Sequence, residues 1–141
     1  MKVLSENIPP ALRHPSSGLA HCLRALGQAR PVQRVVLFGP YARGEQRPDS
    51  DVDLCIVAEG AEDQLAAARD FRRALRNVRP KPAFTLIPIT PARFEEKKAA
   101  GDYFFKTIQE EGICVAEKVA LGERRRPALS PRRKERQGVA P

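Results

Sequence analysis

The sequence contains no tryptophan, only three cysteines and no long apolar run. Cys22, Cys55 and Cys114 are odd in number and lack C-x-x-C spacing, so the pattern favours neither a disulfide framework nor a zinc site. We therefore expect reduced thiols in a cytoplasmic protein. No apolar run approaches the ~20 residues of a membrane span, and no apolar segment typical of a signal peptide occurs near Met1.

Length and charge indicate one domain with a basic extension. The 141 residues are 42% hydrophobic, which is enough for a single core. The formal net charge is +8, and the stretch 118–141 holds eight Lys/Arg against two Glu, so most of the excess lies there. We expect an irregular segment over 1–17, a folded domain over 18–117 and a basic disordered tail over 118–141, whose composition cannot bury enough apolar surface to fold.

Apolar periodicity predicts four helices and four strands, and hence an α/β (α+β) fold in which helices pack against a small β-sheet. The second helix carries Leu65, Ala68, Phe71, Arg72 and Leu75 at helical spacing on the side expected to cover the sheet. The loop between the first two strands is short, so these strands should be antiparallel neighbours. The predicted helices cover 18–29, 62–77, 90–98 and 102–111, and the strands cover 32–38, 52–57, 83–89 and 113–116.

Two carboxylates stand at the start of the second predicted strand. Asp51 and Asp53 are two residues apart, so their side chains leave the same face of the strand, with Cα atoms ~6.6 Å apart. Paired carboxylates repel each other unless a cation lies between them. Hard oxygen ligands of this kind suit Mg²⁺, which takes substrate phosphates as further ligands. A solvated strand face is the alternative interpretation of the same pair.

The turn before this strand has features of a phosphate-binding loop. Gly39 ends the first predicted strand at a sharp turn, and Gly44 relieves the loop that follows. Arg43 lies between them. Backbone N–H groups and a guanidinium beside a carboxylate pair could hold a triphosphate, because both groups bind phosphate oxygens.

The spacing of these residues resembles that of a known family. Gly39 and Pro40, then ten residues, then Asp51-Val52-Asp53 is similar to the Gly-Ser-x10-Asp-x-Asp signature of the polymerase-beta-like nucleotidyltransferase superfamily. The stretch 37–54 looks especially like the small bacterial branch of minimal nucleotidyltransferases.

This resemblance implies a specific activity. It implies a nucleotidyltransferase fold with a small mixed β-sheet packed against helices, and Mg²⁺ at Asp51 and Asp53. It also implies a nucleoside triphosphate, ATP above all, at the Gly39–Gly44 turn that includes Pro40 and Arg43. A nucleotidyl group, AMP in many related small domains, would pass to a protein or other hydroxyl with loss of pyrophosphate. Several small relatives act beside a separately encoded helical partner, as in toxin–antitoxin pairs.

Two departures from the family pattern leave catalysis open. Pro40 replaces the turn serine, so both a hydroxyl and a backbone N–H are missing there. Thr85 aligns with the third carboxylate of the family, and a neutral hydroxyl is neither a good Mg²⁺ ligand nor a base near neutral pH. Glu45 or Asp49 could substitute from the loop.

Two other roles stay open. The first is a catalytically degenerate nucleotidyltransferase fold that binds a partner as a regulatory or antitoxin-like module. The second, ranked lowest, is nucleic-acid binding through the basic tail, which has no aromatic residue for base stacking.

Overall fold

The computed structural model describes residues 1–119, so the predicted basic tail lies almost wholly outside the described residues. Its centre is a five-stranded sheet in the order β1-β5-β2-β3-β4. Antiparallel pairing joins all neighbours except β3 and β4, which run parallel. The predicted mixed sheet and the antiparallel β2–β3 pair are therefore confirmed. The strands are β1 (Lys2–Val3), β2 (Val32–Phe38), β3 (Val52–Ala58), β4 (Phe84–Ile89) and β5 (Ile113–Glu117).

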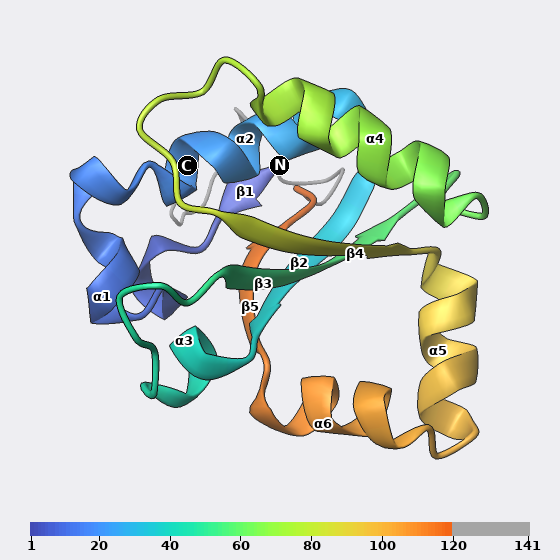
Figure 1. The fold of residues 1–141 in the computed structure, drawn as a ribbon. Coiled ribbons are helices and arrows are strands. Elements are labelled where there is room, and N and C mark those ends of the chain that lie inside the picture. Colours follow the sequence, from blue (N-terminus) through green and yellow to red (C-terminus); the bar gives the residue numbers. More distant parts are fainter. Residues whose placement is uncertain (120–141) are drawn as a thin grey trace, which may run out of the picture.

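Helices cover both faces of the sheet (Figure 1). Helices α2 and α4 pack on one face of the sheet and on each other, and the α5–α6 pair packs on the other face. Side-chain caps start three of the helices, since Asp63, Thr90 and Asp102 accept bonds from backbone N–H groups of α4, α5 and α6. The helices are α1 (Pro10–Arg13), α2 (Leu19–Ala29), α3 (Pro40–Arg43), α4 (Gln64–Leu75), α5 (Pro91–Ala99) and α6 (Tyr103–Glu111). No helix in the described part of the chain is long and apolar enough to cross a membrane.

Alternation along β3 divides its side chains between two hydrophobic clusters. Leu54 and Ile56 belong to the larger cluster under α2 and α4. Cys55 and Val57 belong to the smaller cluster under α5 and α6. Because successive side chains of a strand point to opposite faces, Asp53 shares the α5–α6 face of the sheet with Cys55.

The apolar stripe of α4 differs from the predicted one. Phe71 and Leu75 are buried as expected, but Leu65 is 79% exposed. The buried position in the first turn of α4 is taken by Ala67. The Gln64 side chain instead reaches the edge strand β4 and donates a hydrogen bond of 2.7 Å to the Pro88 carbonyl.

The first seventeen residues contain regular structure that the sequence pattern did not predict. Strand β1 pairs with β5, and two short 3₁₀ helices flank α1. Ile8 and Leu12 are buried in the larger hydrophobic cluster. The prolines that suggested irregular chain instead stand at helix starts, with Pro10 in the first turn of α1.

Candidate functional site

Asp51 and Asp53 lie where β3 begins, on the part of the sheet face that α5 and α6 leave open. Asp51 immediately precedes β3 and is exposed, whereas Asp53 is half-buried. In the parallel pairing with β4, Asp53 stands beside Thr85, and the Thr85 hydroxyl donates a bond of 3.3 Å to Asp51 Oδ2. The fold thus brings two carboxylates and one neutral hydroxyl together from two neighbouring strands.

The two carboxylates differ in their electrostatic environment. Burial raises the pKa of the Asp53 carboxyl above its ordinary value. Hydrogen bonding by Thr85 opposes this rise, the negative charge of Asp51 adds to it, and the charge of Arg43 again opposes it. The single hydroxyl proton of Thr85 can serve only one carboxylate at a time. The ionised form of Asp53 is therefore destabilised in the folded protein, and a bound cation would stabilise it.

Gly39 makes room for Asp53. Its backbone has φ 76° and ψ −161°, a combination that is essentially restricted to glycine. A Cβ at Gly39 would collide with the Asp53 carboxylate oxygen Oδ2. The glycine that the sequence pattern singled out as a phosphate-binding residue is therefore also a structural requirement for the carboxylate beside it.

The turn after Gly39 forms helix α3, which the sequence pattern read as a loop. Ala42 and Arg43 donate backbone hydrogen bonds to the Gly39 carbonyl. Pro40 stands at the first helical position, where its missing N–H costs the helix nothing. Pro40 thus fits the local fold well, although it removes an N–H group that a phosphate would otherwise meet.

Gly44 and Arg43 close this short helix. Gly44 has φ 72° and ψ 25°, and no atom lies within 4 Å of a Cβ built there, so its glycine serves the left-handed turn alone. Arg43 Nε lies 2.9 Å from Glu45 Oε1, and Arg43 Nη1 lies 3.4 Å from Glu111 Oε1. Both carboxylates raise the Arg43 pKa, and the contact with Glu111 joins the Gly39–Gly44 turn to α6.

Neither loop carboxylate completes a three-carboxylate centre in this structure. Glu45 is paired with Arg43, and Asp49 is an exposed residue of the turn before β3. Within residues 1–119, no group of three or more His, Cys, Asp or Glu side chains is placed to hold a metal ion. The donors available to a divalent cation at the strand ends are therefore Asp51, Asp53 and the Thr85 hydroxyl.

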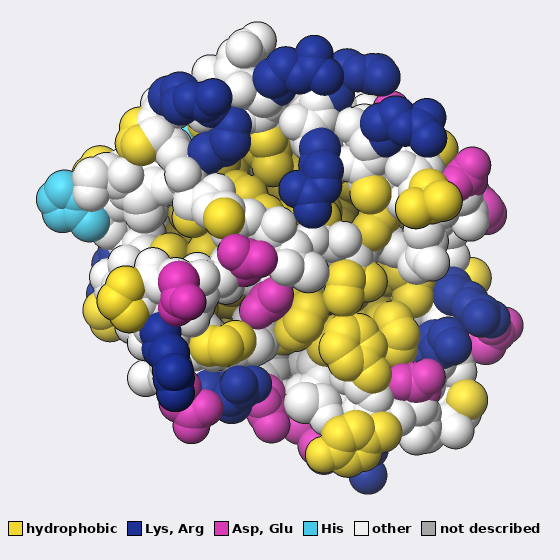
Figure 2. Space-filling view, in the orientation of Figure 1, with side chains coloured by type: hydrophobic (Ala, Val, Ile, Leu, Met, Phe, Trp, Pro, Cys, Tyr) yellow, Lys and Arg dark blue, Asp and Glu magenta, His cyan; other side chains and the backbone are white. Residues whose placement is uncertain are grey.

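An apolar groove adjoins the carboxylates, and the sequence pattern gave no signal for it. Phe38, the cross-strand partner of Asp53, packs edge-on against Phe104 of α6 with ring centroids 5.7 Å apart. Phe104 forms part of a cavity of about 530 Å³ between β4 and the α5–α6 pair. The space-filling view shows the acidic side chains near the start of β3 beside this broad hydrophobic area (Figure 2). The cavity is lined by Ala61, Glu62, Gln64, Ile87, Ile89, Thr90, Arg93, Lys97, Phe104 and Phe105.

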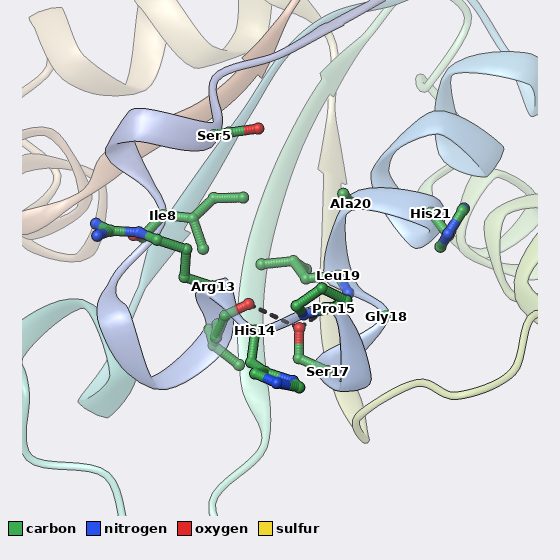
Figure 3. A pocket seen from close by; sticks show the side chains of 11 residues that line it. Ser5, Ile8, Arg13, His14, Pro15, Ser17, Gly18, Leu19, Ala20 and His21 are labelled. Atoms are coloured by element: carbon green, nitrogen blue, oxygen red, sulfur yellow. Dashed lines mark hydrogen bonds between the residues drawn. The ribbon is translucent and has the colours of Figure 1, made fainter.

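A second cavity, of about 180 Å³, lies between the N-terminal segment and the start of α2 (Figure 3). It contains none of the predicted site residues. His14 points to its rim and bonds Ser16 Oγ at 2.7 Å through Nδ1, which is a local capping contact. This cavity is a gap beneath a turn, with the Ser17 hydroxyl bonded to the Leu12 carbonyl across it.

Comparison with known proteins identifies the chain. The family model of the nucleotidyltransferase domain matches residues 19–137, which is well over half of the sequence. The chain belongs to the nucleotidyltransferase domain family. The match includes the Gly39 turn and both carboxylates, so the residues that suggested the superfamily lie inside the matched region.

Solved structures similar to this nucleotidyltransferase domain are distant in sequence. One is a Sulfolobus solfataricus protein assigned as a nucleotidyltransferase, with 15% identity over 72% of this chain and 78% of that chain and a TM-score of 0.49. Another is a toxin–antitoxin structure with AMP-PNP, with 19% identity over 74% of this chain and 75% of that chain and a TM-score of 0.46. No curated protein matches the sequence.

Proposed function

We propose that this chain binds a nucleoside triphosphate, ATP above all, through Mg²⁺ and transfers its nucleotidyl group to a hydroxyl acceptor. The observation that carries the proposal is the convergence of Asp51 and Asp53 on an open sheet face beside the Gly39 turn. The raised pKa of Asp53 and the room that Gly39 leaves around its carboxylate fit a site shaped for a cation. Bound Mg²⁺ would neutralise phosphate charge and polarise the α-phosphoryl group.

The reaction forms one bond and breaks one. The acceptor oxygen forms a bond to the α-phosphorus, and the bond between that phosphorus and the bridging oxygen of pyrophosphate breaks. The acceptor hydroxyl proton passes to solvent, because Thr85 is neutral and cannot take it near neutral pH. Asp51 and Asp53 would hold the cation, while the Gly39 turn and Arg43 would orient the triphosphate.

Two substitutions support a second candidate, a nucleotide-binding or partner-binding module without turnover. Pro40 offers no N–H to phosphate, and Thr85 offers no carboxylate to a second cation, so a two-metal clamp would be incomplete. The helical protein partner implied by the family resemblance belongs to both candidates. Exposed Tyr103 and Phe104 beside the groove give such a partner an apolar contact.

Isothermal titration distinguishes these candidates at the first step. The purified chain is titrated with ATP and the other triphosphates, with and without Mg²⁺, beside Asp51→Asn and Asp53→Asn variants. We expect binding that needs Mg²⁺ and is lost in both variants. Triphosphate binding that is unchanged in both variants would contradict the proposed site. Binding without release of pyrophosphate in the presence of acceptors would favour the module.

A further inference from the structure

Helix α4 presents a face of arginines to solvent. Arg69, Arg72, Arg73 and Arg76 follow helical spacing on the side opposite the buried Phe71, and all four are exposed. We call these four residues the α4 arginine face. Figure 2 shows Lys and Arg side chains gathered over α4 and the segment that follows it, above the acidic side chains at the start of β3.

The positive charge of this face is barely neutralised within the described residues. Its one neighbouring carboxylate, Asp70, already binds Arg30 at 2.8 Å and lies 3.8 Å from Arg73. No carboxylate forms an ion pair with Arg69, Arg72 or Arg76 in the described part of the chain. Like charges one helical turn apart destabilise a helix by about 0.2–0.5 kcal/mol per pair. An external polyanion would remove that repulsion.

Two further cations extend the face toward the site. Arg79 donates hydrogen bonds to the Arg76 and Val78 carbonyls, and Lys81 donates to the Leu75 and Arg76 carbonyls. These bonds satisfy acceptors at the end of α4, but carbonyl groups do not cancel the cationic charge. Residues 69–81 therefore hold six Lys/Arg and a single acidic residue.

The arginine face meets the carboxylate site at the edge of the sheet. Arg72 Nη2 lies 3.4 Å from the Phe84 carbonyl, and Phe84 is next to Thr85, which contacts Asp51. The Ala83 carbonyl accepts a bond of 2.9 Å from Val52 N, so the chain that leaves Lys81 runs directly beside the start of β3. A polyanion along α4 can thus cross the edge strand β4 to the carboxylates.

We propose that the α4 arginine face binds the sugar–phosphate backbone of a nucleic acid whose terminal hydroxyl is the acceptor. Arginine forks bind phosphate oxygens bidentately, and such contacts position a nucleic acid without reading its sequence. The face carries no exposed aromatic residue and one exposed apolar side chain, Leu65, whereas stable protein interfaces need buried aromatic or apolar anchors. The charge pattern therefore favours nucleic acid over an acidic protein.

The identity of the acceptor rests on the proposed function, but the binding surface does not. Fluorescence anisotropy with an end-labelled single-stranded RNA, over a range of salt concentrations, measures the surface alone. The full chain is compared with the triple variant Arg69→Gln, Arg72→Gln, Arg76→Gln. The matched control replaces three exposed lysines elsewhere, of which Lys2 lies on the opposite edge strand β1: Lys2→Gln, Lys106→Gln, Lys118→Gln.

We expect the arginine triple variant to bind RNA about a hundredfold more weakly near 0.1 M salt, because three phosphate contacts contribute about 2 to the slope of log K against log salt. The lysine control should change far less, and Arg→Lys replacements at the same three positions should restore the salt slope. Equal losses in both triple variants would show attraction to net charge alone and overturn the proposal. Absence of RNA binding by the full chain, or equal competition by polyglutamate, would also overturn it.

A transfer assay separates the two levels of the proposal. Asp51→Asn and Asp53→Asn should keep RNA binding and lose transfer of labelled nucleotide to the RNA end. RNA binding through the arginine face without any transfer to RNA would support the surface and contradict the acceptor assignment. Transfer to RNA that is unaffected by the arginine variant at subsaturating RNA would contradict the role of the α4 arginine face in binding that acceptor.

Discussion

Replacing Gly39 with alanine should lower the stability of the protein and displace Asp53, and the same replacement at Gly44 serves as the control. Gly39 has a backbone conformation essentially restricted to glycine, which costs another residue about 1–3 kcal/mol. Its added Cβ would also displace the Asp53 carboxylate. Gly44 has an ordinary left-handed conformation and open space around it, so Gly44→Ala should cost only about 1–2 kcal/mol.

A double-mutant cycle separates the backbone strain at residue 39 from the collision with the Asp53 carboxylate. In an Asp53→Ala background the colliding carboxylate is gone, so Gly39→Ala should retain only its backbone cost. We expect a coupling free energy of about 1–2 kcal/mol between the two positions. Each kcal/mol should lower the melting temperature by about 3–5 °C for a domain of this size, which calorimetry resolves.

Triphosphate binding should also differ between the Gly39 and Gly44 variants. Gly39→Ala should abolish Mg²⁺-dependent triphosphate binding, because Asp53 can no longer occupy its position, whereas Gly44→Ala should bind with at most a modest loss. Additive free energies in the cycle would refute the collision. Intact Mg²⁺-dependent binding by Gly39→Ala would refute the link between this glycine and the carboxylate site.

Three other perturbations test the electrostatics. Asp53→Asn should raise the melting temperature by about 1–4 °C near neutral pH, because burial, and to a smaller extent the charge of Asp51, destabilises the ionised Asp53 carboxylate. Since the folded pKa of Asp53 is raised, this gain should vanish as the pH falls below the unfolded pKa, and a gain that persists in acid would contradict this reasoning. Thr85→Asp should lower stability without metal and increase the melting-temperature rise on adding Mg²⁺, whereas Thr85→Asn should not increase it. Burial raises the Cys55 pKa to about 12, so a thiol reagent at mildly alkaline pH should label half-buried Cys114 before Cys55; mass spectrometry showing Cys55 labelled first in the native protein would exclude this burial.

The sequence predicted the parts of the fold that depend on local pattern. The β-branched run 32–38 and the alternating run 52–57 became β2 and β3 with the expected antiparallel pairing, since pattern and a short loop decide both. Pattern could not predict β1, because a two-residue strand exists only through its pairing with β5, far away in sequence. The prediction that Leu65 is buried was wrong for a similar reason, since tertiary packing buries Ala67 in the first turn of α4 instead.

The proximity of the candidate site residues was predictable where they lie in one short segment of the sequence. Asp51, Asp53 and Gly39 are close in sequence, and their placement beside Thr85 needed only the β3–β4 pairing. The relation between Gly39 and the Asp53 oxygen was not predictable, because it depends on the backbone angles of one residue. The groove beside Phe104 depends on how α6 returns to β2 from the end of the chain.

The edge strand β4 is a poor template for further strands. The carbonyls of Phe84 and Pro88 accept hydrogen bonds from the side chains of Arg72 and Gln64 on α4. Pro88 has no N–H to offer a neighbouring chain. An incoming strand would have to displace two bonded side chains and would still miss one donor, so self-association by sheet extension is opposed at this edge. Edge-to-edge aggregation is therefore disfavoured at the strand that lies beside Asp51 and Asp53, whereas docking through side chains is not opposed in this way.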